Sequence, residues 1–118
     1  MPNNRILTKD EKIKKEISRL LKVFKNLDKN KLATVRPLIQ NAAFMIISLD
    51  ELQEIINRDG YTHEYQNGAN QKGTKQTVEV KIHIEMTRNL HTIIKQLADL
   101  APEAVINDDR LAAFRRIQ

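Results

Sequence analysis

The stretch VEVKIHIEMTRNLHTIIKQLADL, residues 78–100, decides how the chain folds. Its apolar side chains recur every three or four residues, which is the pattern of one helical face and is close to a coiled-coil seam. Thr77 precedes the stretch as a helix cap and Pro102 follows it, so we expect one long helix from Val78 to about Leu100. The residues of the seam are His83, Met86, Leu90, Ile93, Leu97 and Leu100.

Two alternatives are open for this stretch. Val78, Val80 and Ile82 alternate with polar residues and are β-branched, which also indicates an extended segment over residues 78–84. The seam could pack within the protomer, as short seams do in helical bundles, or against a second copy. We expect it to serve subunit packing through Met86, Leu90, Ile93 and Leu97.

Residues 60–76, GYTHEYQNGANQKGTKQ, lie before the long helix and contain all three glycines. The Asn67-Gly68 pair supplies the positive φ angles of a tight turn, so we expect a small hairpin or an ordered loop. Lys72 and Lys75 flank Gly73, where the backbone could approach a phosphate, although a structural turn is the alternative. The spacing does not match a phosphate-binding P-loop.

The N-terminal segment carries the positive charge of the chain. Residues 1–31 hold ten Lys or Arg and four Asp or Glu, whereas residues 32–118 hold ten and eleven. Thr8 and Glu11 form a capping box for a helix over residues 9–27. One face of this helix is apolar, and the other presents a basic stripe that is either a solvated surface or a site for a polyanion. We assign DNA contact to this stripe, which consists of Lys12, Lys15, Arg19 and Lys22.

The segment between the basic helix and the glycine-containing region should form two helices. The first covers about residues 31–47, with Pro37 either opening it or kinking it. Ser48 then starts a second capping box, which predicts a short further helix over residues 49–58 that ends at Gly60. This joint would suit a helix-turn-helix, but the acidic face of the short helix fits the major groove poorly.

Length and composition favour one mostly α-helical domain. The chain has 118 residues, no Cys and no Trp, and no unbroken apolar run long enough to span a membrane. We expect a flexible N-terminus over residues 1–7 and a small bundle of three to four helices over residues 8–102, with a long C-terminal helix. Residues 103–118 are a tail, in which Asn107 could cap a short helix that docks on the core or is ordered only by a partner.

The sequence offers little for catalysis. Ser48 is explained as a helix cap, and His83 and His91 lie about 80° apart around a helix, which is a poor geometry for a shared metal. The acidic residues after Ser48 stand in the first turn of a helix, where they complement its dipole. We therefore expect no enzyme activity, no metal and no cofactor.

Several segments together resemble a known family. They are the capped basic helix, Asn-Ala-Ala-Phe-Met at 41–45, Glu-Tyr-Gln-Asn-Gly-Ala-Asn-Gln-Lys-Gly-Thr-Lys at 64–75, and Ile-Lys-Gln-Leu-Ala-Asp-Leu-Ala-Pro at 94–102. Over residues 8–102 the chain is similar to the small subunit of tailed-phage terminases, of the kind encoded by phages and prophages of Gram-positive bacteria. Such sequences often place Ser-Pro before the last long helix, where this chain has Thr77-Val78.

The resemblance implies a helical protomer that assembles into a ring-like homo-oligomer in the bacterial cytoplasm. It implies that the protein recognises viral double-stranded DNA and presents it to the large terminase subunit, which carries the ATPase and the nuclease. Lys72 and Lys75 are second choices for DNA contact, after the basic stripe. The competing hypothesis is a small helical prophage interaction or adaptor protein that does not bind DNA.

Overall fold

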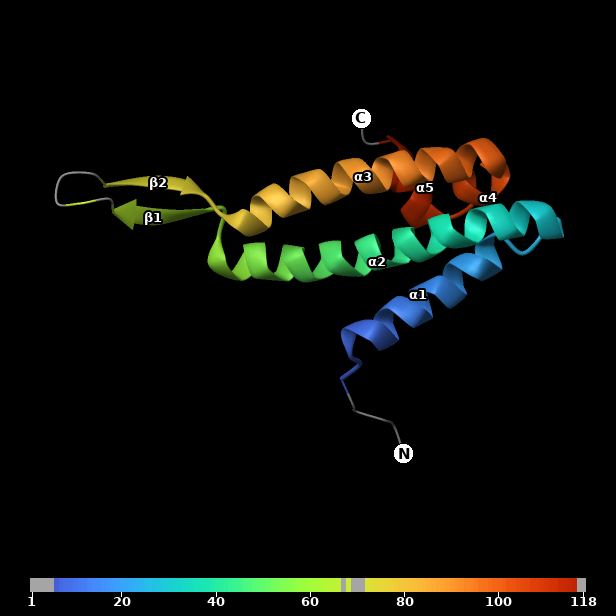
Figure 1. Ribbon diagram of the computed structural model, residues 1–118, viewed down its shortest axis with the longest axis horizontal. Coiled ribbons are helices and arrows are strands. Elements are labelled where there is room, and N and C mark those ends of the chain that lie inside the picture. Colours follow the sequence, from blue (N-terminus) through green and yellow to red (C-terminus); the bar gives the residue numbers. More distant parts are fainter. Residues whose placement is uncertain (1–5, 67, 69–71, 117–118) are drawn as a thin grey trace.

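The computed structural model describes residues 6–66, 68 and 72–116, which form an elongated, mostly helical molecule of 64 × 43 × 21 Å. Two long helices, α2 and α3, run antiparallel side by side, and a β-hairpin projects from the end where they are joined (Figure 1). Helix α1 packs on α2, while α4 and α5 pack on α3. In chain order the elements are α1 (Lys9–Val23), α2 (Lys29–Asp59), β1 (Thr62–Gln66), β2 (Lys72–Gln76), α3 (Val78–Leu100), α4 (Pro102–Ile106) and α5 (Asp109–Arg116).

Helix α2 is continuous, so the expected break at Ser48 is wrong. The helix also continues through Pro37, which lies on its exposed side. Buried apolar residues precede and follow both Pro37 and Ser48 along the helix. The burial of these residues outweighs the local capping pattern at Ser48. Ser48 is itself buried, and Glu51 pairs with Lys9 instead of forming a capping box. A helix-turn-helix joint at Ser48 is therefore excluded.

The long helix α3 has the expected bounds and cap. The Thr77 hydroxyl oxygen accepts a hydrogen bond from the Val80 backbone N–H at 3.4 Å, and the helical alternative for residues 78–84 is the one observed. Helix α2 ends at Gly60, whose φ of 87° is favourable only for glycine. Between the two helices the glycine-containing region forms the hairpin. Its turn includes Gly68, while Asn67 lies outside the described residues.

Helix α1 is shorter than expected, and the expected tail contains short helices that dock on the core, which is one of the two alternatives open for it. Helix α1 ends at Val23 rather than near Leu27, because the chain turns through Phe24, whose ring is almost fully buried. At the other end, α4 spans Pro102–Ile106, so the domain boundary expected after Pro102 falls inside a helix. Helices α4 and α5 dock on the core, to which they contribute the fully buried Val105 and Leu111.

Asp108, rather than Asn107, caps the last helix. Its Oδ2 accepts a hydrogen bond from the Leu111 backbone N–H at 3.1 Å, while Asn107 is the C-terminal cap of α4. The carboxylate of Asp108 is therefore fixed at the link between α4 and α5.

One hydrophobic core holds the helices together at the end of the molecule away from the hairpin. Its fully buried side chains include Leu20 of α1, Ile39 and Ile46 of α2, and Leu90 and Leu97 of α3. Burying such a side chain contributes roughly 1.5–3 kcal/mol.

Helix α2 supplies most of the middle of this core. An 18-residue window in it has a mean hydropathy of 1.4, which by length and composition would also suffice to cross a membrane. Here the buried part of this window packs between α1 and α3.

Candidate nucleic-acid interface

The basic stripe of α1 lines a shallow groove rather than a convex face. Lys12, Lys15, Arg19 and Lys22 surround an open cavity of about 410 Å³, whose floor includes Ile47 of α2. The three lysines are exposed, and Arg19 is partly buried. The structure therefore brings the four predicted residues together, but their surroundings differ.

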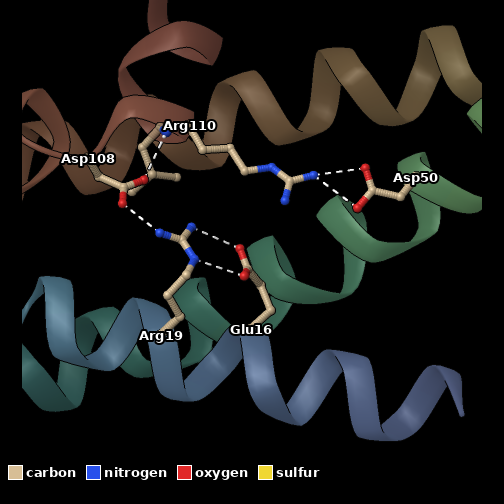
Figure 2. A network of polar contacts seen from close by, with 6 residues as sticks. Glu16, Arg19, Asp50, Asp108 and Arg110 are labelled. Carbon is tan, nitrogen blue, oxygen red and sulfur yellow. Dashed lines mark hydrogen bonds and ion pairs between the residues drawn. The ribbon is translucent and has the colours of Figure 1, made fainter. Parts of the chain in front are cut away.

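Arg19 is held in an ion-pair network (Figure 2). Its Nε and Nη2 donate to the two carboxylate oxygens of Glu16, both at 2.9 Å, and its Nη1 donates to Oδ1 of Asp108 at 2.6 Å. The side chains of Glu16 and Asp108 are only 9% and 10% exposed. Glu16 first, and Asp108 after it, raises the pKa of the Arg19 guanidinium above its usual value, so Arg19 stays protonated. Arg19 thus ties α1 to the link between α4 and α5.

Lys12 stands between basic and acidic surroundings. The same lysine lines a neighbouring cavity of about 460 Å³ with the α2 side chains Asp50, Glu51, Gln53 and Glu54. Asp50 pairs with Arg110 of α5 at 2.8 Å, and Glu51 pairs with Lys9 at 2.9 Å (the first pair is in Figure 2). These carboxylates line the same cavity as Lys12, so they lower the attraction of a phosphate to Lys12.

Lys15 and Lys22 are the stripe residues best placed to meet a polyanion. Both are exposed, and within the described part of the chain neither has an ion-pair partner. The turn between α1 and α2 adds Lys25, and the first residue of α2 adds Lys29; both are exposed in the same way. The predicted stripe ended at Lys22 and did not include these two. The charge balance of residues 1–31 is the signal that includes them.

The hairpin holds the second-choice lysines. Lys75 lies opposite His63, and its Nζ is 5.6 Å from the centroid of the Tyr65 ring. That ring lies across Gly73, where a Cβ atom would come within 2.9 Å of Tyr65 Cε1. Lys72 is placed by its backbone opposite Gln66, and its side chain lies outside the described part of the structure.

The predicted subunit-packing residues are divided between the core and the surface. Leu90 and Leu97 are fully buried within the protomer, because they pack into the same core as α2 and α4, and so they offer no surface to a second copy. Met86 and Ile93 pack against this core and remain partly exposed. The apolar side chains of α3 that are clearly exposed lie nearer the hairpin, at Val78, Ile82 and Ile84.

No metal-binding arrangement is found in the described ranges. Groups of three or more His, Asp or Glu side chains with suitable geometry do not occur there. Outside the groove of the basic stripe, a cavity of about 540 Å³ lies between the α1–α2 turn and α4, and its lining mixes Phe24, Leu27 and Ala104 with Glu103 and Asp108.

No family model, no curated protein and no solved structure matches the chain. The assignment of a function therefore depends on the residues and geometry of the chain itself.

Proposed function

We propose that the protein is a non-catalytic, DNA-recognising subunit of a phage DNA-packaging terminase. It would bind viral double-stranded DNA as a ring-like homo-oligomer and present it to the large ATPase and nuclease subunit, in the cytoplasm of a bacterial host. The likeness of residues 64–75 and 94–102 to terminase small subunits suggests this role. The observation that carries it is the group of exposed lysines on α1, in the turn after it and at the start of α2, for which the described part of the chain holds no ion-pair partner.

The DNA contact is assigned to the part of the basic surface whose charge is available. Lys15, Lys22, Lys25 and Lys29 are exposed, and the described residues provide no ion-pair partner for any of them. A few such contacts per protomer bind weakly, but an assembly that repeats them gains avidity. Arg19 is a poorer candidate than the sequence suggested, because its guanidinium already donates three hydrogen bonds within the protomer.

The assembly surface is assigned to the flank of α3 that remains open. Met86 and Ile93 continue along the same flank as the exposed Val78 and Ile82. Because burial of apolar surface drives association, this flank is the natural place for a second copy to pack.

A titration with duplex DNA tests the proposal. A fluorescent 30-bp duplex is titrated with the protein between 50 and 300 mM salt, and we expect affinity to fall steeply as salt rises, because phosphate contacts release counterions. Lys15→Glu with Lys22→Glu should lower the affinity at least tenfold. The matched control, Lys81→Glu with Lys95→Glu on α3, makes the same change in net charge and should have a much smaller effect. Equal losses in both pairs would show that only net charge matters and would contradict the assigned face.

Solution mass tests the assembly. Light scattering should give a multiple of the 13.7 kDa protomer mass, and Ile82→Lys should lower it without unfolding the exposed site. The competing hypothesis, a helical adaptor without DNA contact, predicts no salt-dependent binding at all. A monomer that binds no duplex would favour that alternative.

A further inference from the structure

The β-hairpin is not covered by any other described part of the chain. Every residue of β1 is exposed, and so are Thr74, Lys75 and Gln76 of β2. The hairpin projects beyond the joined ends of α2 and α3 (Figure 1). An isolated two-stranded hairpin is at best marginally stable in water, so an arm of this kind is suited to a partner that covers it.

The composition of the two strands indicates the chemistry of that partner. The strands read THEYQ and KGTKQ and contain no aliphatic side chain. The core of a protein–protein interface is typically apolar or aromatic, and among the described residues of this ribbon only Tyr65 offers such a side chain. Hydroxyl, amide, carboxylate and ammonium groups instead fit a partner that presents many hydrogen-bonding groups.

The register divides these side chains between two faces. Thr62 pairs with Gln76, and Glu64 pairs with Thr74, so these four residues share one face, here called the polar face. Within the described part of the chain none of the four makes a side-chain hydrogen bond or an ion pair. The opposite face carries His63, Tyr65, Gly73 and Lys75, where the Tyr65 ring lies against Gly73 and Lys75.

We infer that the hairpin is the element that reads DNA sequence, by entering the major groove with its polar face toward the base edges. The major groove is about 12 Å wide and admits a two-stranded ribbon, and five residues per strand extend about 17 Å along it. Gln76 can form paired hydrogen bonds with adenine, Glu64 can accept from the cytosine amino group, and threonines suit several bases. The inference rests on the proposed function, because it gives a base-reading role to an arm of a protein whose lysines bind phosphates.

Selection followed by binding tests this inference. The unaltered protein is used to enrich duplexes from a library with 20 random base pairs, and its affinity for the enriched duplex is compared with that for a scrambled one. Replacing Gln76 and Thr74 by Ala should reduce the preference at least tenfold, while the affinity for the scrambled duplex and its salt dependence stay the same. The matched control, His63→Ala on the opposite face, should keep the preference.

Two further measurements guard against loss of the hairpin itself. Glu64→Gln keeps the shape of the side chain and should change the preferred base at one position rather than abolish binding. In the unaltered protein, hydrogen exchange over residues 62–66 and 72–76 should slow when the enriched duplex is added, and not when the protein concentration alone is raised.

The possible failures can be told apart. Failure of the unaltered chain to bind any duplex would overturn the proposed function together with this inference. Binding without an enriched sequence, or a preference that survives the Gln76 and Thr74 replacements, would overturn this inference alone. Protection of the hairpin by protein concentration alone would also overturn it, because the partner would then be a second copy.

Discussion

Replacing Arg19 by Met should destabilise the protein far more than its surface position suggests. The replacement removes three charge-assisted hydrogen bonds and leaves two nearly buried carboxylates, Glu16 and Asp108, without their partner. Breaking a fully buried ion pair costs about 3–5 kcal/mol, whereas an exposed pair contributes about 0–1 kcal/mol. The Arg19 side chain is 39% exposed, so solvent screening lowers the estimate to about 2 kcal/mol.

Thermal unfolding followed by circular dichroism measures this effect. For a domain of this size, about 2 kcal/mol corresponds to a fall in Tm of roughly 8 °C. Lys15→Met is the matched control, because Lys15 lies one helical turn away, is exposed and should change stability by less than about 0.5 kcal/mol. If both variants unfolded at the same temperature, the network would not contribute to stability and the reasoning would be refuted.

The pH dependence of the network has a defined sign. Folding raises the pKa of Arg19, chiefly through its hydrogen bonds to Glu16, so its contribution is present below the unfolded-state pKa and is lost only as pH rises through the higher folded value. The difference in Tm between the unaltered protein and Arg19→Met should therefore stay constant from pH 7 to pH 9. A difference that shrank over this range would contradict the assignment.

Three further substitutions test the fold. Leu97→Ala should lower the free energy of unfolding by about 2–5 kcal/mol in urea denaturation, because it leaves a cavity in the core. The control is Gln96→Ala at the exposed neighbouring position, which should leave the free energy of unfolding nearly unchanged. Ser48→Ala should stabilise by roughly 0.5–1 kcal/mol, because the Ser48 hydroxyl is buried and finds no hydrogen-bond partner among the described residues. A clear loss in Tm would indicate a partner for it. Gly60→Ala should cost about 1–3 kcal/mol in urea denaturation, because the φ of 87° at this position strains any residue with a Cβ. An unchanged denaturation midpoint would show that the end of α2 relaxes to accommodate the Cβ.

Local signals predicted the helices where packing agreed with them. Thr77 and the seam of α3 gave its bounds, and Gly60 gave the end of α2, because capping and periodicity are properties of nearby residues. The capping pattern at Ser48 failed for the opposite reason. Whether a Ser starts a helix or lies buried inside one depends on what packs against it, and that information lies elsewhere in the chain.

The candidate site was predictable in charge but not in connectivity. The charge balance and the stripe spacing identified the basic face of α1. Nothing near Arg19 indicated that it would pair with Asp108, a residue 89 positions away. Likewise, the seam of α3 correctly predicts a helix. Only the tertiary arrangement shows that Leu90 and Leu97 are buried in the core of the protomer while Ile82 remains exposed.

The contacts of α1 determine how this helix can separate from the rest of the fold in a local unfolding event. This helix packs mainly on α2, whereas α2 and α3 support each other along their lengths and α3 also carries α4 and α5. A partial opening that releases α1 breaks one interface and the Arg19 bridge, but leaves the antiparallel pair and its hairpin in place. The lysines of α1 therefore lie on a helix that can open while the antiparallel pair stays folded, and a partner that binds these lysines in the closed form raises the free energy of that opening.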